Sequence, residues 1–417
     1  MKRIALVLLA VLLVLSLAGC GGDKKSGAAG KASLVYWTMW NEAEPQGQVI
    51  AQAAEAFTKE TGIKIDVNFN GRDIRQTLQP ALEAGTTIDL FDEDVDRVNS
   101  AWASFLANLD PYVSKAYPTT GGKPFDQVVS TTLMNLVKEK GGGSVKSIPY
   151  QPFIFAVMYN KDLFSEAGIT GVPKTWDELL DACAKLKAKN TYAFTVDDAY
   201  IAPLFGYTIA RIAGKDTAAK MVANNDFSGP QTLRAAQLWE NMISKGYVHP
   251  NTAGNVYPAG QVNEFSQGRA AMYLNGTWLP NEIKSNAPNM NWGTFAYPNI
   301  DPAGDGIEAN NFGAQCFGVN KNSKYPEEAF QFIVTMTTGQ YDEALARESL
   351  GVPMGNNATW PRQLADAKAV LDNTKVRLDW AANFQDDANI NAKVTENFAR
   401  MVAGSMNAQQ FADSMKR

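Results

Sequence analysis

The feature that most limits the possible folds is an alternation of strand and helix patterns in residues 33–91. The segment "SLVYWTMW" is rich in β-branched and aromatic residues, and "QGQVIAQAAEAFTKETG" spaces its apolar residues as a helix does and ends on Gly62. The strand "IKIDVNF", the helix "DIRQTLQPALEAG" and the strand "TIDLF" come next. This β-α-β-α-β order predicts an α/β fold in which helices cover a parallel sheet.

The middle of the chain repeats this alternation. "SIPYQPFIFAVMYN" is apolar and extended, and "TWDELLDACAKLKAK" is an amphipathic helix in which Thr175 and Glu178 form a capping box. Further strands are predicted at "TYAFTV", "AAMYLNG" and "GAQCFGVN". The tail is predicted to be helical with a break at Gly404.

The N-terminus has the pattern of an export signal. Lys2 and Arg3 precede an apolar run, residues 4–17, which is shorter than the roughly 20 residues that span a bilayer. The motif "LAGC", which ends at Cys20, resembles the lipobox of bacterial lipoproteins. This resemblance implies that residues 1–19 are a lipoprotein signal peptide and that lipidation of Cys20 anchors the protein to the outer face of the cell membrane. The alternative is ordinary signal-peptide cleavage that leaves a free cysteine.

Composition limits the rest of the chain. Residues 20–32 contain no large apolar side chain, so we expect a flexible tether. Removing 19 of the 417 residues leaves 398, more than one core usually covers, which predicts two domains. The net charge of -5 with no basic block argues against a nucleic-acid partner. Cys183 and Cys316 are expected to be reduced, as small buried apolar residues.

Three stretches carry a family resemblance. The first is "IPYQPFIFAVMYNKDLFSEAGITGVPKTWDELLDACAKLK", the second "EFSQGRAAMYLNGTW", and the third "YPEEAFQFIVTMTTGQ" with the later "LGVPM". Their Tyr-Asn-Lys-Asp-Leu-Phe, Pro-Lys-Thr-Trp-Asp-Glu-Leu, Gly-x-Ala-Ala-Met and Gly-x-Pro motifs resemble those of family 1 bacterial solute-binding proteins, which feed carbohydrate ABC importers. The motifs stand in the family's order and cover nearly the whole mature chain.

The resemblance implies a type II periplasmic-binding-protein-like fold of two α/β lobes, joined by crossing strands and holding the ligand in the cleft between them. The expected first lobe comprises residues 33–151 and 315–355, and the second residues 155–310 and 360–417. Ligands of open α/β sheets sit beyond the carboxyl ends of the strands. The loops at residues 40–42 and 92–97 are therefore expected to face the cleft.

Sugar recognition needs bidentate polar groups for hydroxyls and aromatic rings for the apolar faces of the pyranose. By similarity to maltodextrin-binding members of the family, Asp96 and Arg97 match a sugar-binding Asp-Arg pair, and Trp278 and Tyr200 match stacking residues. Glu93 and Phe153 depart from those members, so another sugar is expected. The full set of candidate ligand-binding residues is Trp40, Asn41, Glu42, Asp92, Glu93, Asp96, Arg97, Tyr150, Gln151, Tyr200, Trp278, Asn310, Asn311 and Phe312.

The sequence therefore predicts a monomeric, lipid-anchored, extracytoplasmic receptor that binds a mono- or oligosaccharide and delivers it to ABC permease subunits. No catalytic residue, metal or cofactor is predicted; the acidic segment "IDLFDEDVDR" lacks the ligand spacing and the glycine of an EF-hand. Two alternatives stay open: a secreted glycoside hydrolase with paired carboxylates, and a cell-surface adhesion lipoprotein. The acidic segment also leaves an amino sugar or another cationic ligand open.

Overall fold

The computed structural model describes residues 32–254 and 259–416. The predicted signal peptide, residues 1–19, the lipidation site Cys20 and all but the last residue of the predicted tether lie outside the described residues. None of the described helices has both the length and the apolar composition that crossing a membrane requires.

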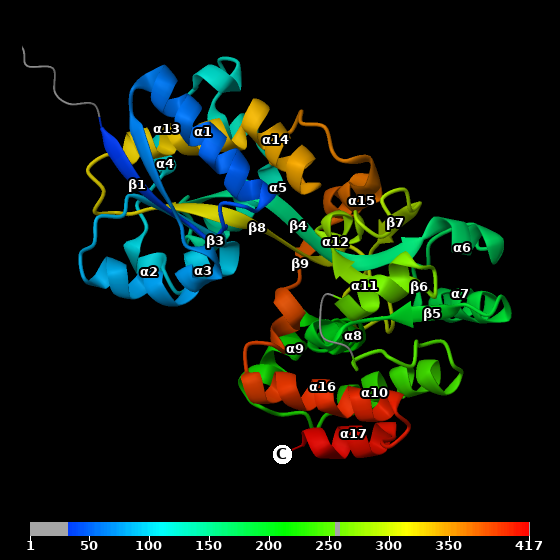
Figure 1. Ribbon diagram of the computed structural model, residues 1–417. Helices are drawn as coiled ribbons and strands as arrows, with labels where there is room; N and C mark the ends of the chain where they lie inside the picture. Colours follow the sequence, from blue (N-terminus) through cyan, green and yellow to red (C-terminus); the bar gives the residue numbers. More distant parts are fainter. Residues whose placement is uncertain (1–31, 255–258, 417) are drawn as a thin grey trace, which may run out of the picture. The chain divides into compact units, whose positions relative to one another are not determined.

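The strands form one sheet in the order β2-β1-β3-β8-β4-β6-β5, with β7 paired to β4 and β9 paired to β8 (Figure 1). The first three pair in parallel, as the sequence predicts. The strands are β1 (Ser33–Thr38), β2 (Lys64–Phe69), β3 (Leu90–Asp94), β4 (Ser147–Asn160), β5 (Tyr192–Thr195), β6 (Ala270–Gly276), β7 (Trp292–Phe295), β8 (Ala309–Val319) and β9 (Val376–Arg377).

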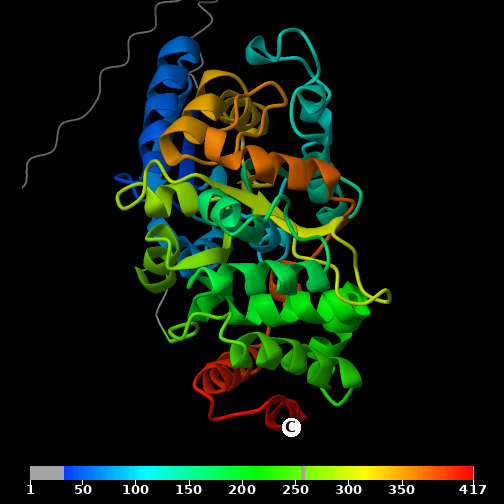
Figure 2. The same cartoon turned by 90° about the vertical axis from the view of Figure 1, so that its right-hand side faces the viewer.

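Helices pack against both ends of the sheet, and α10, α16 and α17 pack on one another (Figure 2). The α-helices are α1 (Pro45–Thr61), α2 (Ile74–Glu83), α3 (Val95–Asn99), α4 (Asp110–Val113), α5 (Thr131–Lys140), α6 (Lys161–Glu166), α7 (Trp176–Ala188), α8 (Ile201–Ala213), α9 (Lys215–Ala223), α10 (Pro230–Ser244), α11 (Ala259–Ser266), α12 (Leu279–Ile283), α13 (Pro326–Thr337), α14 (Gln340–Ser349), α15 (Ala365–Asn373), α16 (Ala388–Val402) and α17 (Ala408–Met415). The 3-10 helices used below are η5 (Asp198–Tyr200) and η7 (Trp380–Asn383).

The predicted helix ends are confirmed. Gly62 follows α1 with a φ of 74°, and its N–H donates to the Thr58 carbonyl at 2.8 Å. Thr175 caps α7, its hydroxyl accepting from the Glu178 N–H while the Glu178 carboxylate accepts from the Thr175 N–H. The tail breaks at Gly404, which has a φ of 70°.

The prediction that residues 92–97 form a loop is wrong. The carboxylate-bearing residues Asp92, Glu93 and Asp94 belong to β3, which pairs antiparallel with β8. Helix α3 then begins at once with Val95. The sequence pattern ended the strand early because charged residues are rare in buried strands. Here ion pairs and hydrogen bonds within the lobe offset the free-energy cost of burying these carboxylates.

Two hydrophobic cores support the two lobes. The first packs around β1, β3 and residues of β4 as far as Met158, and the second around β5, β6, α8 and α10. The long strands β4 and β8 run from one group of elements to the other (Figure 1). Cys316 lies in the first core and Cys183 in the second, both as buried free thiols. The first core continues onto α11, α12 and α15, so the predicted lobe boundaries stay a prediction.

Candidate ligand-binding site

A cavity of about 800 Å³ lies where elements of the two cores meet. Its size suits a small oligosaccharide. Its lining residues are Arg75, Asp94, Asp96, Arg97, Ser100, Ala101, Lys140, Phe153, Trp278, Gln315, Asp379, Trp380, Asn383 and Asp386.

Aromatic side chains packed on the second core form one wall of this cavity. Trp278, which follows β6, stands 5.8 Å from the ring of Phe153 and 6.4 Å from that of Trp380. Phe155 stacks behind Trp278 with its ring centroid 5.9 Å away, and Tyr200 of η5 lies 6.3 Å from Trp278. This wall offers broad apolar faces of the kind that pack against a pyranose ring.

Charged side chains from α2, α3 and α5, elements of the first core, form another wall of the cavity. Asp94 fixes the geometry of α3, because its Oδ1 accepts hydrogen bonds from the backbone N–H groups of Asp96 and Arg97, each at 3.0 Å. This cap places Asp96 and Arg97 in the first turn of the helix, at the cavity. Burial and the neighbouring Glu93 carboxylate raise the pKa of Asp94 to about 7.

Asp96 is held by two cations. Its Oδ2 lies 2.8 Å from Arg377 of β9, and its Oδ1 lies 2.7 Å from the Lys140 ammonium. Burial alone would raise the pKa of Asp96, but Arg377 and Lys140 lower it below its ordinary value. The carboxylate is therefore ionised and fixed in orientation. Arg97 differs, because within the described residues its closest carboxylate contacts are long, 3.8 Å to Glu93 and 4.0 Å to Asp94.

Asp92 supports the first lobe from inside and does not line the cavity. It is fully buried, and its carboxylate accepts hydrogen bonds from the Tyr36 and Tyr150 hydroxyls, from Thr38 and from the Met39 N–H. Burial raises the pKa of Asp92 to about 6, although these donors oppose the shift. The prediction that Asp92 faces the cleft is therefore corrected.

Glu93 is also fully buried, behind the ionic wall. Its Oε1 accepts from Arg75 at 2.6 Å and its Oε2 from the Asp94 N–H at 2.8 Å. Burial would raise the pKa of Glu93, but hydrogen bonds from Asp94 and Arg75 lower it. Glu93 orients Arg75 and Asp94, which reach the cavity, and does not itself line it.

Three of the predicted residues line this cavity together: Asp96, Arg97 and Trp278. Tyr200 is buried behind Trp278. Tyr150 is buried too, and its hydroxyl accepts from the Trp40 indole at 2.7 Å. Of the predicted residues on β8, the Asn310 amide donates to the Ile307 carbonyl, the Asn311 amide donates to the Leu378 carbonyl, and Phe312 is buried.

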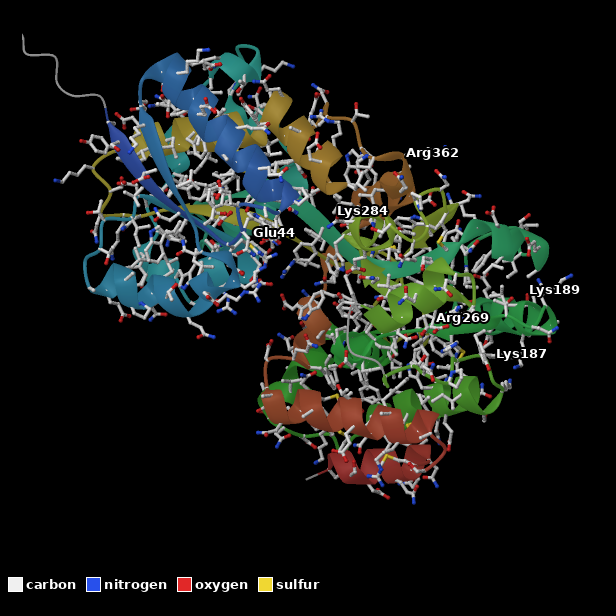
Figure 3. All side chains as sticks on the ribbon, in the orientation of Figure 1. Glu44, Lys187, Lys189, Arg269, Lys284 and Arg362 are labelled. Carbon is white, nitrogen blue, oxygen red and sulfur yellow. The ribbon has the colours of Figure 1, made fainter. Side chains whose placement is uncertain are left out.

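The remaining predicted residues do not line this cavity. Asn41 and Glu42 are exposed just before α1. There Glu44, labelled in Figure 3, accepts from the Asn41 N–H at 2.6 Å and pairs with Arg72. Gln151 sits at a bulge in β4 with a φ of 43°, and its amide donates to Ser349 at 2.7 Å. These contacts order the first lobe and the crossing strand.

Sequence reasoning missed much of the wall, including Arg75, Lys140, Gln315 and Asp379. Each comes from a segment distant in the chain from the acidic stretch, and no local pattern marks it. Trp380, beside Asp379, also lines the cavity, and the sequence alone does not assign it to cleft or core. Asp94 had a usable signal, since an aspartate directly before a helix is a common N-cap.

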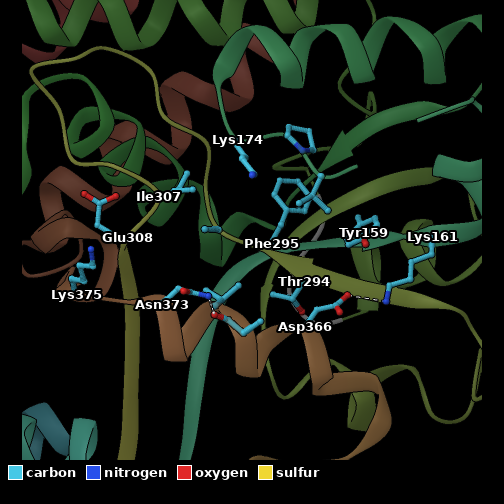
Figure 4. Close-up of a pocket in the computed structure, with 15 residues that line it drawn as sticks. Tyr159, Lys161, Lys174, Thr294, Phe295, Ile307, Glu308, Asp366, Asn373 and Lys375 are labelled. Atoms are coloured by element: carbon cyan, nitrogen blue, oxygen red, sulfur yellow. Dashed lines mark hydrogen bonds and ion pairs between the residues drawn. The ribbon is translucent and has the colours of Figure 1, made fainter. Parts of the chain in front are cut away.

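A second cavity, of about 630 Å³, lies between β7, α15 and the loop that precedes α7 (Figure 4). Phe295, Val172 and Val370 contribute apolar surface, and Lys161 pairs with Asp366 at 2.8 Å on its edge. It is smaller than the cavity at Trp278 and includes none of the predicted site residues. We therefore take the cavity at Trp278 as the candidate site.

The fold and this site define a two-lobe solute-binding protein. The family of bacterial extracellular solute-binding proteins matches residues 41–342, and the chain belongs to that family. A multiple sugar-binding protein of Streptococcus mutans is 25% identical over 436 residues, covering 100% of this chain and 98% of the relative. A binding protein of Brucella abortus is 27% identical, covering 72% of this chain and 71% of its own. The structure of a chitin oligosaccharide binding protein matches with a TM-score of 0.69 at 21% identity, over 93% of this chain and 98% of that one.

Proposed function

We propose that this protein is the lipid-anchored, extracytoplasmic substrate-binding component of a carbohydrate ABC importer, and that it binds a mono- or oligosaccharide in the cavity at Trp278. The observation that carries the proposal is the pairing of two unlike walls. Trp278, Trp380 and Phe153 offer apolar faces, while Asp96, Arg97 and Lys140 offer acceptors and donors. A sugar presents the same two kinds of surface, ring faces and hydroxyls.

The ligand is expected to be uncharged. The acidic stretch left a cationic ligand open, but its carboxylates are already engaged. Asp92 has four protein donors, Glu93 pairs with Arg75, and Asp96 pairs with Arg377 and Lys140. These three carboxylates therefore offer an amino sugar little unpaired negative charge. Relatives named for sugars and chitin oligosaccharides support a neutral glycan.

Closure of the lobes would complete the site. Trp278 Nε1 and Gln315 Oε1 are buried without a hydrogen-bond partner among the described residues, which is costly. A sugar that reaches these groups favours the closed state, and only such a difference in affinity can shift the equilibrium. The closed surface is what the permease subunits would recognise.

The test is isothermal titration calorimetry of the purified protein against malto-, cello-, xylo- and chito-oligosaccharides, raffinose and glucosamine. Saturable binding of a neutral sugar, with no new reducing ends after prolonged incubation, is expected. Release of reducing ends would instead identify a glycoside hydrolase. Binding of glucosamine alone would identify a cationic ligand, and no binding at all would favour the adhesion alternative.

A further inference from the structure

All three guanidinium nitrogens of Arg377 donate hydrogen bonds within the protein. Its Nη2 donates to Asp96 at 2.8 Å, its Nη1 to Asp379 at 2.6 Å, and its Nε to the Phe312 carbonyl at 2.8 Å. Only 12% of its side chain is exposed. Because each guanidinium nitrogen already has an acceptor, Arg377 is poorly placed to bind a ligand itself. Its contacts act on other residues.

These contacts connect the two walls of the cavity. Asp96 and Lys140 belong to α3 and α5, whose apolar residues lie in the first core. Asp379 directly precedes η7, whose Ala381 and Ala382 lie in the second core. Lys140 closes the network, with its ammonium 2.7 Å from Asp96 and 3.7 Å from Asp379. Arg377 lies on β9, a strand that pairs with β8, and bonds to both Asp96 and Asp379.

The Asp96 carboxylate, held in this way, is preorganised to accept a hydrogen bond from a ligand. An ionised carboxylate has about four acceptor sites, and two cations leave some of them open to a hydroxyl. Fixing the side chain before binding removes an entropic cost from the binding step. Asp96 lines the cavity and keeps 38% of its side chain exposed, so it can still be reached.

We propose that Arg377 is a positioning residue for sugar binding: it holds Asp96 in the orientation that accepts a ligand hydroxyl and ties that orientation to the placement of the second lobe through Asp379. This inference rests on the proposed function and names a residue that touches no sugar. It has an unusual consequence. The affinity for an uncharged sugar should fall with rising salt, because Lys140, Asp96 and Asp379 are 32%, 38% and 47% exposed and their ion pairs are screened.

The experiment is a double-mutant cycle on the dissociation constant of the best-binding neutral sugar from the panel above. Arg377→Met alone should weaken binding about tenfold, as expected for the loss of charge-assisted hydrogen bonds. In the Asp96→Asn background the same change should weaken binding less than about twofold, because its target is already neutral. Arg362→Met, an exposed arginine outside this cavity, is the matched control and should change nothing.

Salt gives the second readout. Wild-type affinity should fall several-fold between 0.05 and 0.5 M NaCl, and this dependence should be weaker in Arg377→Met, which loses the ion pairs of Arg377 with Asp96 and Asp379 but keeps those of Lys140. Equal losses from Arg377→Met in both backgrounds, or the same salt dependence in wild type and variant, would overturn the proposal. If Arg377→Met does not fold by circular dichroism, Arg377→Lys and Lys140→Met replace it in the same cycle. Failure of the wild type to bind any sugar would instead refute the proposed function.

Discussion

The two walls of the cavity are built in different ways. On the side of the first core, hydrogen bonds and ion pairs fix the wall: Asp94 caps α3, Glu93 holds Arg75, and Asp92 ties β3 to β1 and β4. On the side of the second core, Trp278 and Trp380 rest on other aromatic rings. Ligand binding at the first wall depends on the orientation of hydrogen-bonding groups. At the second wall it depends on the area of apolar ring surface. The walls should therefore respond differently to substitution.

The largest effect is expected where the first wall is anchored. Asp92→Ala leaves the Tyr36 and Tyr150 hydroxyls and the Met39 N–H without their buried acceptor. We expect the free energy of unfolding to fall by about 3 kcal/mol. Urea denaturation measures this, with Asp126→Ala, an exposed aspartate, as the control. A loss as small as that of the control would mean that Asp92 does not anchor the wall.

Substitutions in the second wall should weaken sugar binding and change the stability of the protein little. Trp278→Ala removes the central ring of the aromatic wall, and we expect sugar binding to weaken roughly thirtyfold, about 2 kcal/mol. The control is Trp360→Ala, which removes a half-buried tryptophan that does not line the cavity. Calorimetry should show wild-type affinity in the control. Unchanged affinity in Trp278→Ala would remove the aromatic wall from the site.

A change of pH tests Asp92, which anchors the first wall, without removing its side chain. Because the folded pKa of Asp92, about 6, lies above its ordinary 3.8, the folded protein binds more protons than the unfolded chain between those values. Stability is therefore lost as pH rises through this window. Asp94, Asp197 and Asp342 act in the same direction, while His249, whose pKa is lowered, opposes them below about pH 6.5.

The comparison of wild type with Asp92→Asn isolates this one group. The loss of stability between pH 5 and pH 8 should be smaller in the variant by about 1 kcal/mol, since the other titrating groups are common to both proteins. Urea midpoints at the two pH values measure it. Equal losses in both proteins would show that the Asp92 carboxyl keeps an ordinary pKa.

The smallest effect is expected from a single donor on the first wall. Arg97→Met removes a guanidinium whose carboxylate contacts are long, so the first lobe should stay intact while sugar affinity falls threefold to fivefold, less than about 1 kcal/mol. Arg347→Met, an exposed arginine paired with Glu348, is the control. An equal effect of the two variants on the dissociation constant would exclude a direct contact by Arg97.

Sequence reasoning worked for features written in neighbouring residues and failed for those assembled at a distance. The helical periodicity before Gly62, the capping box at Thr175 and the long strand before Asn160 were all legible. The end of β3 was not, because a partner such as Arg75, which makes buried Glu93 possible, lies 18 residues away. The Asp96–Arg377 pair spans 281 positions. No alternation or spacing records such a contact.

The central claim is that a sugar binds between the aromatic and ionic walls. A crystal structure of the protein with the tightest neutral sugar of the panel tests it most directly. The account predicts a pyranose ring packed on Trp278, with hydroxyls within hydrogen-bond distance of Asp96 and Arg97 and the Arg377–Asp96 pair intact. A sugar seated instead between β7 and α15, in the cavity of Figure 4, would contradict it.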